Sequence, residues 1–378
     1  MTKISRTTDM TQGSEMRHII MFSLPLLAGN LLQQTYNIVD TMVVGRYLGD
    51  DALAAVGATG SITYLFYTLC IGLSVGAGII VAQYFGAGKK KAMRSAVFNS
   101  ALVTAIFGIV ISLLSVPAAK PILELLKVPD KLIGDSVAYM QIACGGTIAV
   151  AAYNWINAIM RALGDSKTPL IFLGAASLLN ALLDLLFVVV FKFGIAGAAW
   201  ATVLTQALSA ISCIVYCFAV SGEIKLTADD LHADKDMMSR CVKTGVPIAI
   251  QNGLISVSMV ALQRVTNGFG ETVMAAYTVS MRIEQFVQQP FSSLNAAVST
   301  FTGQNIGAGK EKRAQKGLAC AIKISVIFST VVLVLFTLFG GAITSWFVKG
   351  KTVISISAKA LIITSLFYWS LGIIHTTR

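Results

Sequence analysis

The sequence predicts an all-α polytopic membrane protein built from two pseudo-symmetric helical lobes. Of the 378 residues, 55% are hydrophobic and only 12% are charged, about half the charged fraction of a typical soluble domain. Apolar stretches of spanning length recur from one end of the chain to the other, and the second half repeats motifs of the first. These observations exclude a water-soluble fold and a soluble enzyme on a single anchor.

Ten stretches reach the length of about 20 mostly apolar residues that a spanning helix needs. No run alternates with period two, as the wall of a membrane β-barrel requires. The first stretch lacks a small-residue cleavage site behind it, so we interpret it as a spanning helix and not as a signal peptide. The predicted spans are residues 19–44, 56–82, 95–117, 132–160, 170–191, 195–219, 245–267, 272–301, 317–340 and 353–375.

The loops between these spans alternate in charge. The N-terminal tail and the loops after even-numbered spans, such as residues 89–94 and 310–316, are rich in Lys and Arg, whereas the other loops hold fewer. Cytoplasmic loops of membrane proteins carry this excess. We therefore expect a protein of the cytoplasmic (plasma) membrane with a cytoplasmic N-terminus. The Lys and Arg residues that fix this orientation account for the net charge of +11. The positive charge therefore does not indicate nucleic-acid binding, and we expect no nucleic-acid partner.

A densely charged segment, residues 221–243, separates spans six and seven. Such a segment is typical of a cytoplasmic linker that is partly an amphipathic helix. The chain is therefore predicted to consist of a cytoplasmic tail (1–18), an N-lobe of six spans (19–220), this linker, and a C-lobe of four spans (244–378).

The two halves of the chain repeat each other. "AQYFGAGKKK" at 82–91 recurs as "GQNIGAGKEK" at 303–312, an offset of 221 residues, and Gly49 meets Gly270 at the same offset. Six spans separate equivalent points, so both copies have the same orientation, as in known transporters. A full second copy would extend past residue 378. We therefore expect ten of twelve spans, from either an incomplete chain or a truncated product.

Polar residues in spans one, five and six form the candidate cation or proton site. Asp40 lies deep in span one, where a charge costs about 2.5–3.5 kcal/mol, and Asn180 and Asp184 share a face of span five at a spacing of four. Span six adds Thr202. These oxygen ligands suit H⁺ or Na⁺ and exclude a soft metal. The alternative is an Asp buried for helix packing, and spacing alone does not bring Asp40 to Asp184.

A second group of polar residues is expected to line a substrate cavity. The candidates in span one share or border the helical face of Asp40, and those in span four form a polar stripe that ends at Arg161. One lies in span six on the same face as Thr202. The pair in span eight could instead lie at the membrane interface. The candidates are Gln33, Tyr36, Asn37, Asn154, Asn157, Gln206, Glu284 and Gln288.

No pattern of enzyme chemistry stands out in the sequence. The three His and six Cys form no metal-ligand or nucleophile arrangement, and the GAGK segments do not fit the GxxxxGK[ST] pattern of a phosphate-binding loop. We therefore expect a protein that is not an enzyme and that binds no cofactor other than a coupling ion.

Four segments together carry a family resemblance: "NIVDTMVVGRYLG" in span one, "VAQYFGAGKKK" after span two, "IMRALGDSKTPL" after span four and "TFTGQNIGAGKEKRA" in the second half. With them the chain resembles the multidrug and toxic compound extrusion (MATE) family of secondary antiporters. It is similar to the DinF-like branch, which implies a cation site at Asp40, Asn180, Asp184 and Thr202. Spans seven and ten contain no Asp or Glu, which argues against the C-lobe site of another branch.

The resemblance implies two lobes in a V and an antiporter coupled to H⁺ or Na⁺ that works by alternating access. It implies export of amphipathic, often cationic drugs or metabolites, so we expect an organic cation as substrate, contact with membrane lipid, and a monomer. Two alternatives stay open. One is a flippase for lipids or lipid-linked sugars from the same superfamily, which a cluster of intramembrane Arg or Lys would favour. The other is a non-transporting truncated remnant.

Overall fold

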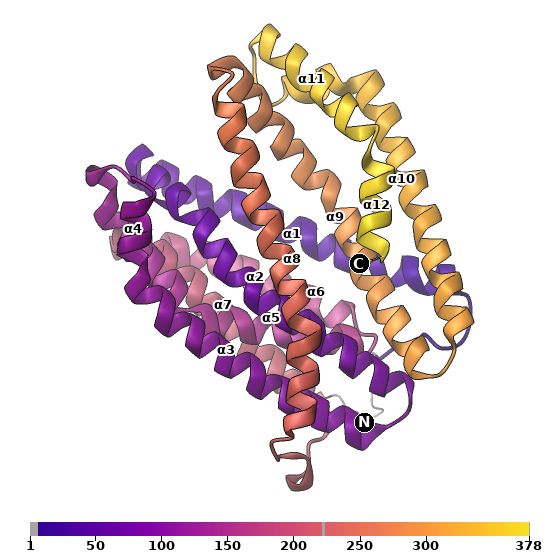
Figure 1. The fold of residues 1–378 in the computed structure, drawn as a ribbon. Helices are drawn as coiled ribbons and strands as arrows, with labels where there is room; N and C mark the ends of the chain where they lie inside the picture. The colour runs from indigo at the N-terminus through magenta and orange to yellow at the C-terminus, as the bar shows by residue number, and fades with distance from the viewer. Residues whose placement is uncertain (1–6, 221–223, 378) are drawn as a thin grey trace.

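The computed structural model describes residues 7–220 and 224–377, and every regular element in that part of the chain is a helix (Figure 1). The predicted all-α class is therefore confirmed. Residues 1–6 of the expected tail, residues 221–223 of the expected linker and Arg378 lie outside the described residues.

The first bundle consists of eight helical elements. The predicted fourth span is two helices bent by 42° at their junction, and the fifth passes directly into a short π-helix. The elements are α1 (Glu15–Leu48), α2 (Asp50–Gly86), α3 (Lys90–Leu125), α4 (Asp130–Gly145), α5 (Thr147–Ala162), α6 (Lys167–Asp184), the π-helix η1 (Leu185–Val190) and α7 (Gly194–Val220).

The linker and the second bundle follow. A 3₁₀ turn, η3 (Ala228–Asp230), lies within the predicted linker. The next helix begins at Lys235, inside the predicted linker, because the side chain of Asp234 caps it by accepting from the backbone N–H groups of Asp236 and Met237. The helices are α8 (Lys235–Asn267), α9 (Glu271–Gly307), α10 (Glu311–Ser345), α11 (Lys351–Ser365) and α12 (Tyr368–Thr377), the last two bent by 49°.

The sequence repeat is also a repeat of structure. Helices α2 and α9 are each 37 residues long and begin and end at positions 221 residues apart. The turns that follow them contain Gly88 at φ 68° and Gly309 at φ 72°, a left-handed conformation that favours glycine. The α4–α5 bend recurs as the α11–α12 bend.

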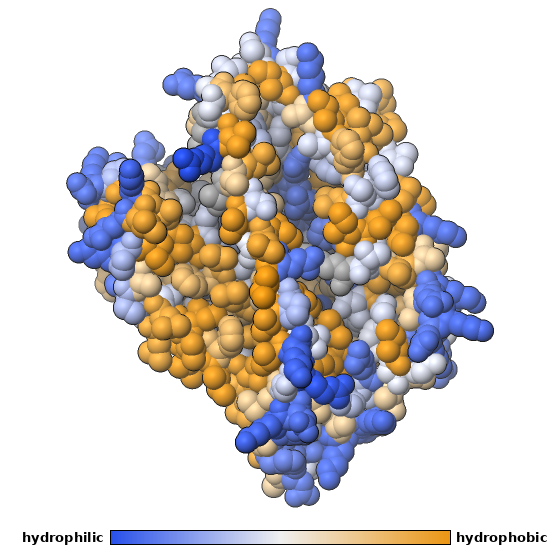
Figure 2. Space-filling model, in the orientation of Figure 1, coloured by the Kyte–Doolittle hydropathy of each residue, from blue (hydrophilic) through white to orange (hydrophobic). Residues whose placement is uncertain are grey.

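The described helices have the character of a membrane protein. Six are long and apolar enough to cross a membrane, and each bent pair taken as one span brings the number to eight. Of the ten predicted spans, α1 and α9 do not reach this hydropathy, because amide and charged side chains interrupt them. Exposed Leu113, Leu178 and Leu338 lie on outer helix faces, and Figure 2 shows an apolar surface between hydrophilic ends.

The two bundles meet mainly through α2, which packs along α8 as well as against α9. At one end of the molecule, α2 and α9 form a seam of small residues. A Cβ at Gly86 would lie 1.9 Å from the carbonyl oxygen of Gln304, and a Cβ at Gly307 would lie 1.9 Å from that of Gln83. Only glycine allows this backbone approach. We call this contact the glycine seam.

The N-terminal tail covers the glycine seam. The N–H of Met10 donates to Gln304 Oε1 over 2.9 Å, while the Gln304 side-chain amide donates to the carbonyl of Ala162 over 2.9 Å. Arg313 donates to the carbonyl oxygens of Met10, Gln12 and Gly13. The bundles are therefore tied together at this end, and they diverge toward α4 and α11 (Figure 1). We call the tied end the basic end, because the Lys- and Arg-rich turns at 89–94 and 310–316 lie there.

Candidate functional site

Asp40 and Asp184 form a carboxylate pair between α1 and α6. Helix α1 packs against both α6 and α7, and this contact brings Asp40 within electrostatic reach of Asp184. Asp184 is fully buried and Asp40 is partly buried. The structure thus joins the two carboxylates that helical spacing alone could not bring together.

Several buried polar atoms around the carboxylate pair have no hydrogen-bond partner within the described residues. They are Asp40 Oδ1, both carboxylate oxygens of Asp184, and the amide oxygen and nitrogen of Asn180. Each unpaired buried group costs about 1–3 kcal/mol, so such a cluster calls for an explanation. A bound proton or hard cation would supply the missing partner of the oxygens, and this set of carboxylate and amide oxygens fits one.

The backbone changes its helical type at the carboxylate pair. Asp184 is the last residue of α6, and the π-helix η1 starts at the next residue. Such π-helical segments are rare and are frequent at functional sites. The run "LLFVVV" gives no sign of this change in its composition, so sequence reasoning missed it.

Tyr36 and Thr202 connect the surroundings of the carboxylate pair to a cavity. The Tyr36 hydroxyl interacts with the Thr202 side chain and lies within electrostatic reach of both carboxylates. Both residues also line the cavity described next. Of the predicted cation residues, Thr202 therefore lines the cavity, and Asp40 and Asp184 lie next to Tyr36 in its wall.

A cavity of about 510 Å³ opens within the first bundle, between α1, α2, α5, α6 and α7. We call it the N-terminal cavity. Six of the eight predicted substrate-cavity residues line it, namely Gln33, Tyr36, Asn37, Asn154, Asn157 and Gln206. Glu284 instead faces Thr364 and Tyr368 in the second bundle. Neither Glu284 nor Gln288 lines a described cavity, so their expected role gains no support from the geometry.

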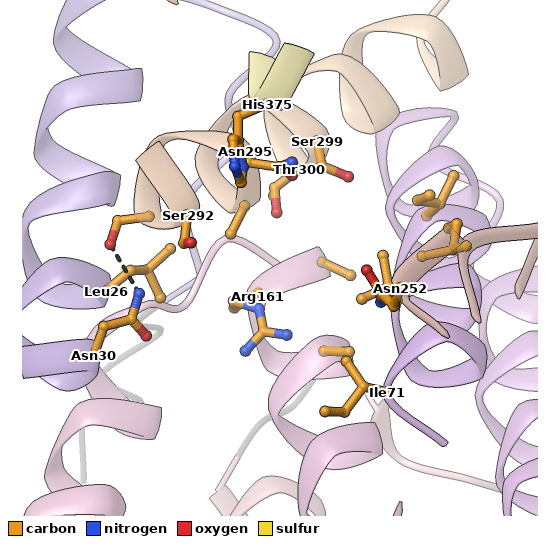
Figure 3. A pocket seen from close by; sticks show the side chains of 18 residues that line it. Leu26, Asn30, Ile71, Arg161, Asn252, Ser292, Asn295, Ser299, Thr300 and His375 are labelled. Atoms are coloured by element: carbon orange, nitrogen blue, oxygen red, sulfur yellow. Dashed lines mark hydrogen bonds between the residues drawn. The ribbon is translucent and has the colours of Figure 1, made fainter. Parts of the chain in front are cut away.

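A second cavity, of about 370 Å³, lies between the two bundles, and we call it the central cavity (Figure 3). At its edge the Asn30 amide donates to Ser293 Oγ over 3.0 Å, which joins α1 to α9. The central cavity and the N-terminal cavity adjoin, because four residues line both: Leu26, Asn30, Ile71 and Arg161.

Sequence reasoning did not single out the aromatic part of this lining. Tyr64 and Tyr67 from α2 and Tyr153 from α5 line the N-terminal cavity. Their spacing does not distinguish them from aromatic side chains that face lipid. The sequence pattern did point to Arg161, because this residue continues the polar stripe of Asn154 and Asn157. The pattern alone does not show which part of the structure the stripe faces.

In the described part of the chain, no group of three or more His, Cys, Asp or Glu side chains could hold a metal ion. The candidate site is instead two carboxylates with amide and hydroxyl oxygens beside a polar cavity. Such a site can exchange a proton or a monovalent cation.

Comparisons with known proteins agree on one family. A family model described as MatE matches residues 25–186 and 247–378. The probable multidrug resistance protein YpnP of Bacillus subtilis is 29% identical over 367 residues, which are 97% of this chain and 82% of YpnP. YoeA of the same organism, also described as a probable multidrug resistance protein, is 30% identical over 373 residues, with 97% and 81% covered.

A solved structure has the same fold. It is described as the outward-facing conformation of a multidrug resistance MATE family transporter of the MOP superfamily. Its TM-score is 0.91 at 23% sequence identity, and the match covers 98% of this chain and 84% of that one.

Proposed function

Because the chain belongs to the MatE family of membrane transporters, we propose that it exports small amphipathic molecules by alternating access, driven by inward movement of H⁺ or Na⁺. It is an integral membrane protein and not an enzyme. The proposal includes a cytoplasmic N-terminus, the cytoplasmic membrane, a monomer in contact with lipid, and the DinF-like branch. The multidrug resistance names of YpnP and YoeA support drug export.

The observation that carries this proposal is the carboxylate pair next to Tyr36 in the wall of the N-terminal cavity. Asp40 and Asp184 lie together, and the buried polar atoms around them lack partners among the described residues. A cation bound there neutralises negative charge and pairs those oxygens. Asn180 and Thr202 complete the proposed set of ligands.

Helix α1 offers a route for coupling. It carries Asp40 and also the cavity residues Gln33 and Asn37, and it contains Pro25 within the helix. A proline removes one backbone hydrogen bond and weakens the helix at that point. Cation binding at Asp40 would favour one position of α1 against α6 and so alter the cavity. Coupling of this kind needs only a difference in cation affinity between two conformations.

The arrangement of the bundles supports alternating access. The bundles are tied together at the basic end and diverge at the other (Figure 1), so this conformation is accessible from one side. Export requires a second conformation in which the glycine seam opens.

The two alternatives are not favoured. A flippase for anionic lipid headgroups would be expected to have a cluster of Arg and Lys in its cavity, whereas Arg161 is the one Arg or Lys among the described lining residues. The relatives with the family match are described as multidrug resistance proteins, which argues against a non-transporting remnant. The expected organic-cation substrate rests on the resemblance, since no carboxylate lines either described cavity.

Asp40→Asn tests the proposed coupling in proteoliposomes with imposed H⁺ or Na⁺ gradients. The variant should insert and fold, yet lose gradient-driven dye export by more than about tenfold, because the neutral amide cannot exchange a charge. Asp135→Asn, at an exposed carboxylate of α4 outside both cavities, is the matched control and should export like the wild type. Undiminished gradient-driven export by folded Asp40→Asn would overturn the proposal.

A further inference from the structure

Arg161 places a single positive charge in the shared wall of the two cavities. It extends from the last turn of α5 into the space between the bundles, below Asn295 and Thr300 (Figure 3). Among the described residues that line either cavity, it is the one Asp, Glu, Lys or Arg. Apart from the imidazole of His375, the charge on this lining therefore comes from one guanidinium group.

The guanidinium group of Arg161 has no ion-pair partner in the part of the chain that the structure describes, and no hydrogen bond of its side chain is found there. Its electrostatic neighbour is the hydroxyl of Tyr153. Buried charges in proteins are normally paired, and charged residues inside a membrane mark functional sites. A half-buried cation without a counter-ion therefore indicates a group that arrives with a ligand.

The carboxylate pair does not serve as that counter-ion. Asp40 and Asp184 interact with each other, and neither is among the electrostatic neighbours of Arg161 in the described part of the chain. Neither carboxylate lines the central cavity. The carboxylate pair and the positive charge of Arg161 are thus not paired with each other.

The surroundings of Arg161 suit an anionic group. A guanidinium presents five N–H donors in a planar fork that matches a carboxylate or phosphate. Asn252, Asn295, Ser299 and Thr300 add amide and hydroxyl groups around the same space. A positive charge between low-dielectric walls also concentrates anions from solution.

We propose that Arg161 binds the anionic group of the exported substrate in the central cavity, so that the substrate is an amphipathic organic anion. This inference rests on the proposed export function and differs from the organic cation that the resemblance implies. The adjoining N-terminal cavity, with Tyr64, Tyr67 and Tyr153 in its wall, would accept the apolar or aromatic part of such a molecule.

Equilibrium binding of two xanthene dyes to the purified full chain tests this inference. 5-Carboxyfluorescein is anionic and rhodamine 123 is cationic, so they compare charge on similar ring systems. The wild type should bind carboxyfluorescein more tightly. Arg161→Gln should weaken carboxyfluorescein binding by about tenfold to hundredfold, the range of a charge-assisted hydrogen bond, and leave rhodamine binding unchanged. Arg161→Lys should lie between them, because it keeps the charge but loses the fork.

Arg264→Gln is the control, because it removes one positive charge from an exposed position of α8 outside both cavities. It should leave the binding of both dyes unchanged. A wild-type protein that binds no anionic dye or prefers rhodamine overturns the inference, and so does an equal loss of both dyes in Arg161→Gln. The relative affinity of the wild type for the two dyes is measured without any variant. It therefore tests the inference even if Arg161→Gln does not fold.

Export of the same dyes under imposed gradients is measured separately. Absence of gradient-driven export of either dye contradicts the proposed function, whereas the charge preference in equilibrium binding decides the inference about Arg161. The two failures are therefore distinguishable.

Discussion

The unpaired atoms of Asp40, Asn180 and Asp184 make the carboxylate pair unfavourable in the absence of a ligand. Burial removes their contact with water, and apart from the mutual contact of the two carboxylates, the atoms named above have no hydrogen-bond partner among the described residues. A cation or proton that binds only the folded protein lowers the free energy of the folded state by an amount that grows with ligand concentration. The coupling ion should therefore also act as a stabilising ligand.

We expect the thermal unfolding temperature of the purified wild type to rise with its coupling ion. Replacing choline by Na⁺ at fixed pH tests Na⁺, and lowering the pH at fixed salt tests H⁺. At 100 times the dissociation constant the gain is about 2.7 kcal/mol. Asp184→Asn should lose this response and Asp135→Asn should keep it. An Asp184→Asn protein that responds like the wild type would show that the ion binds elsewhere.

Much of this site could be predicted from single residues. Placing the charged side chain of Asp40 inside the membrane costs free energy, which marks it as a candidate. Asn180 and Asp184 share a helical face because their spacing of four residues is close to one helical turn. Their encounter could not be predicted, because helical periodicity fixes a face on one helix and not the neighbour that covers it. The same limit applies to Arg161, whose polar stripe is visible in the sequence while its cavity depends on the second bundle.

At the scale of elements, the linker is a docked segment and not only a charged connection. The carboxylate of Asp230 accepts from the backbone and hydroxyl of Thr227 and from Arg94 Nε of α3 over 2.8 Å. Asn99 of α3 accepts from the backbone N–H of Asp234 over 2.8 Å. The charge density of residues 221–243 predicts a solvated linker. It does not predict the contacts with Arg94 and Asn99, which lie more than 130 residues earlier in the chain.

Asp230→Asn should destabilise this docked linker in a pH-dependent way. The hydrogen bonds from Thr227, together with the nearby Arg94 guanidinium, hold the pKa of Asp230 below its usual value. Because the folded pKa is the lower one, the stabilisation is fully present above the unfolded value of about 3.9 and is lost as the pH falls through the folded pKa. The difference in unfolding temperature between wild type and variant should therefore be constant from neutral pH to about 5 and shrink below about 4.

Asp229→Asn is the control for this comparison, since its exposed side chain lies beside Asp230. It should have a smaller effect at every pH. A difference between wild type and Asp230→Asn that persists or grows in acid would contradict the assigned role of the carboxylate.

At the scale of the whole molecule, the repeat explains why two bundles can make close backbone contact at one end. Helices α2 and α9 are equivalent, so each contributes a glycine to the seam and meets the backbone of the other. The repeat and its offset could be predicted from sequence, because the motifs are collinear. Contact between the copies could not, since a repeat defines equivalent positions and not the axis that relates them.

Gly86→Ala and Gly307→Ala should each prevent full closure of the glycine seam. The added Cβ would lie 1.9 Å from a carbonyl oxygen, and overpacking of this kind costs about 1–3 kcal/mol. That cost corresponds to a shift of about 5- to 150-fold in the population of the closed conformation. Because the two positions are equivalent in the repeat, the two variants should behave alike.

Labelling of Ala162→Cys with a membrane-impermeant thiol reagent from the basic side reports on closure. Ala162 is buried beside the glycine seam and accepts a hydrogen bond from Gln304. The rate should rise in both glycine variants, measured against the same proteins without the introduced cysteine. Gly57→Ala and Gly60→Ala in α2, where an added Cβ meets nothing within 4 Å, should leave it unchanged. Equal rates in Gly86→Ala and Gly57→Ala would mean that the two bundles do not separate at the glycine seam, and alternating access would then need another hinge.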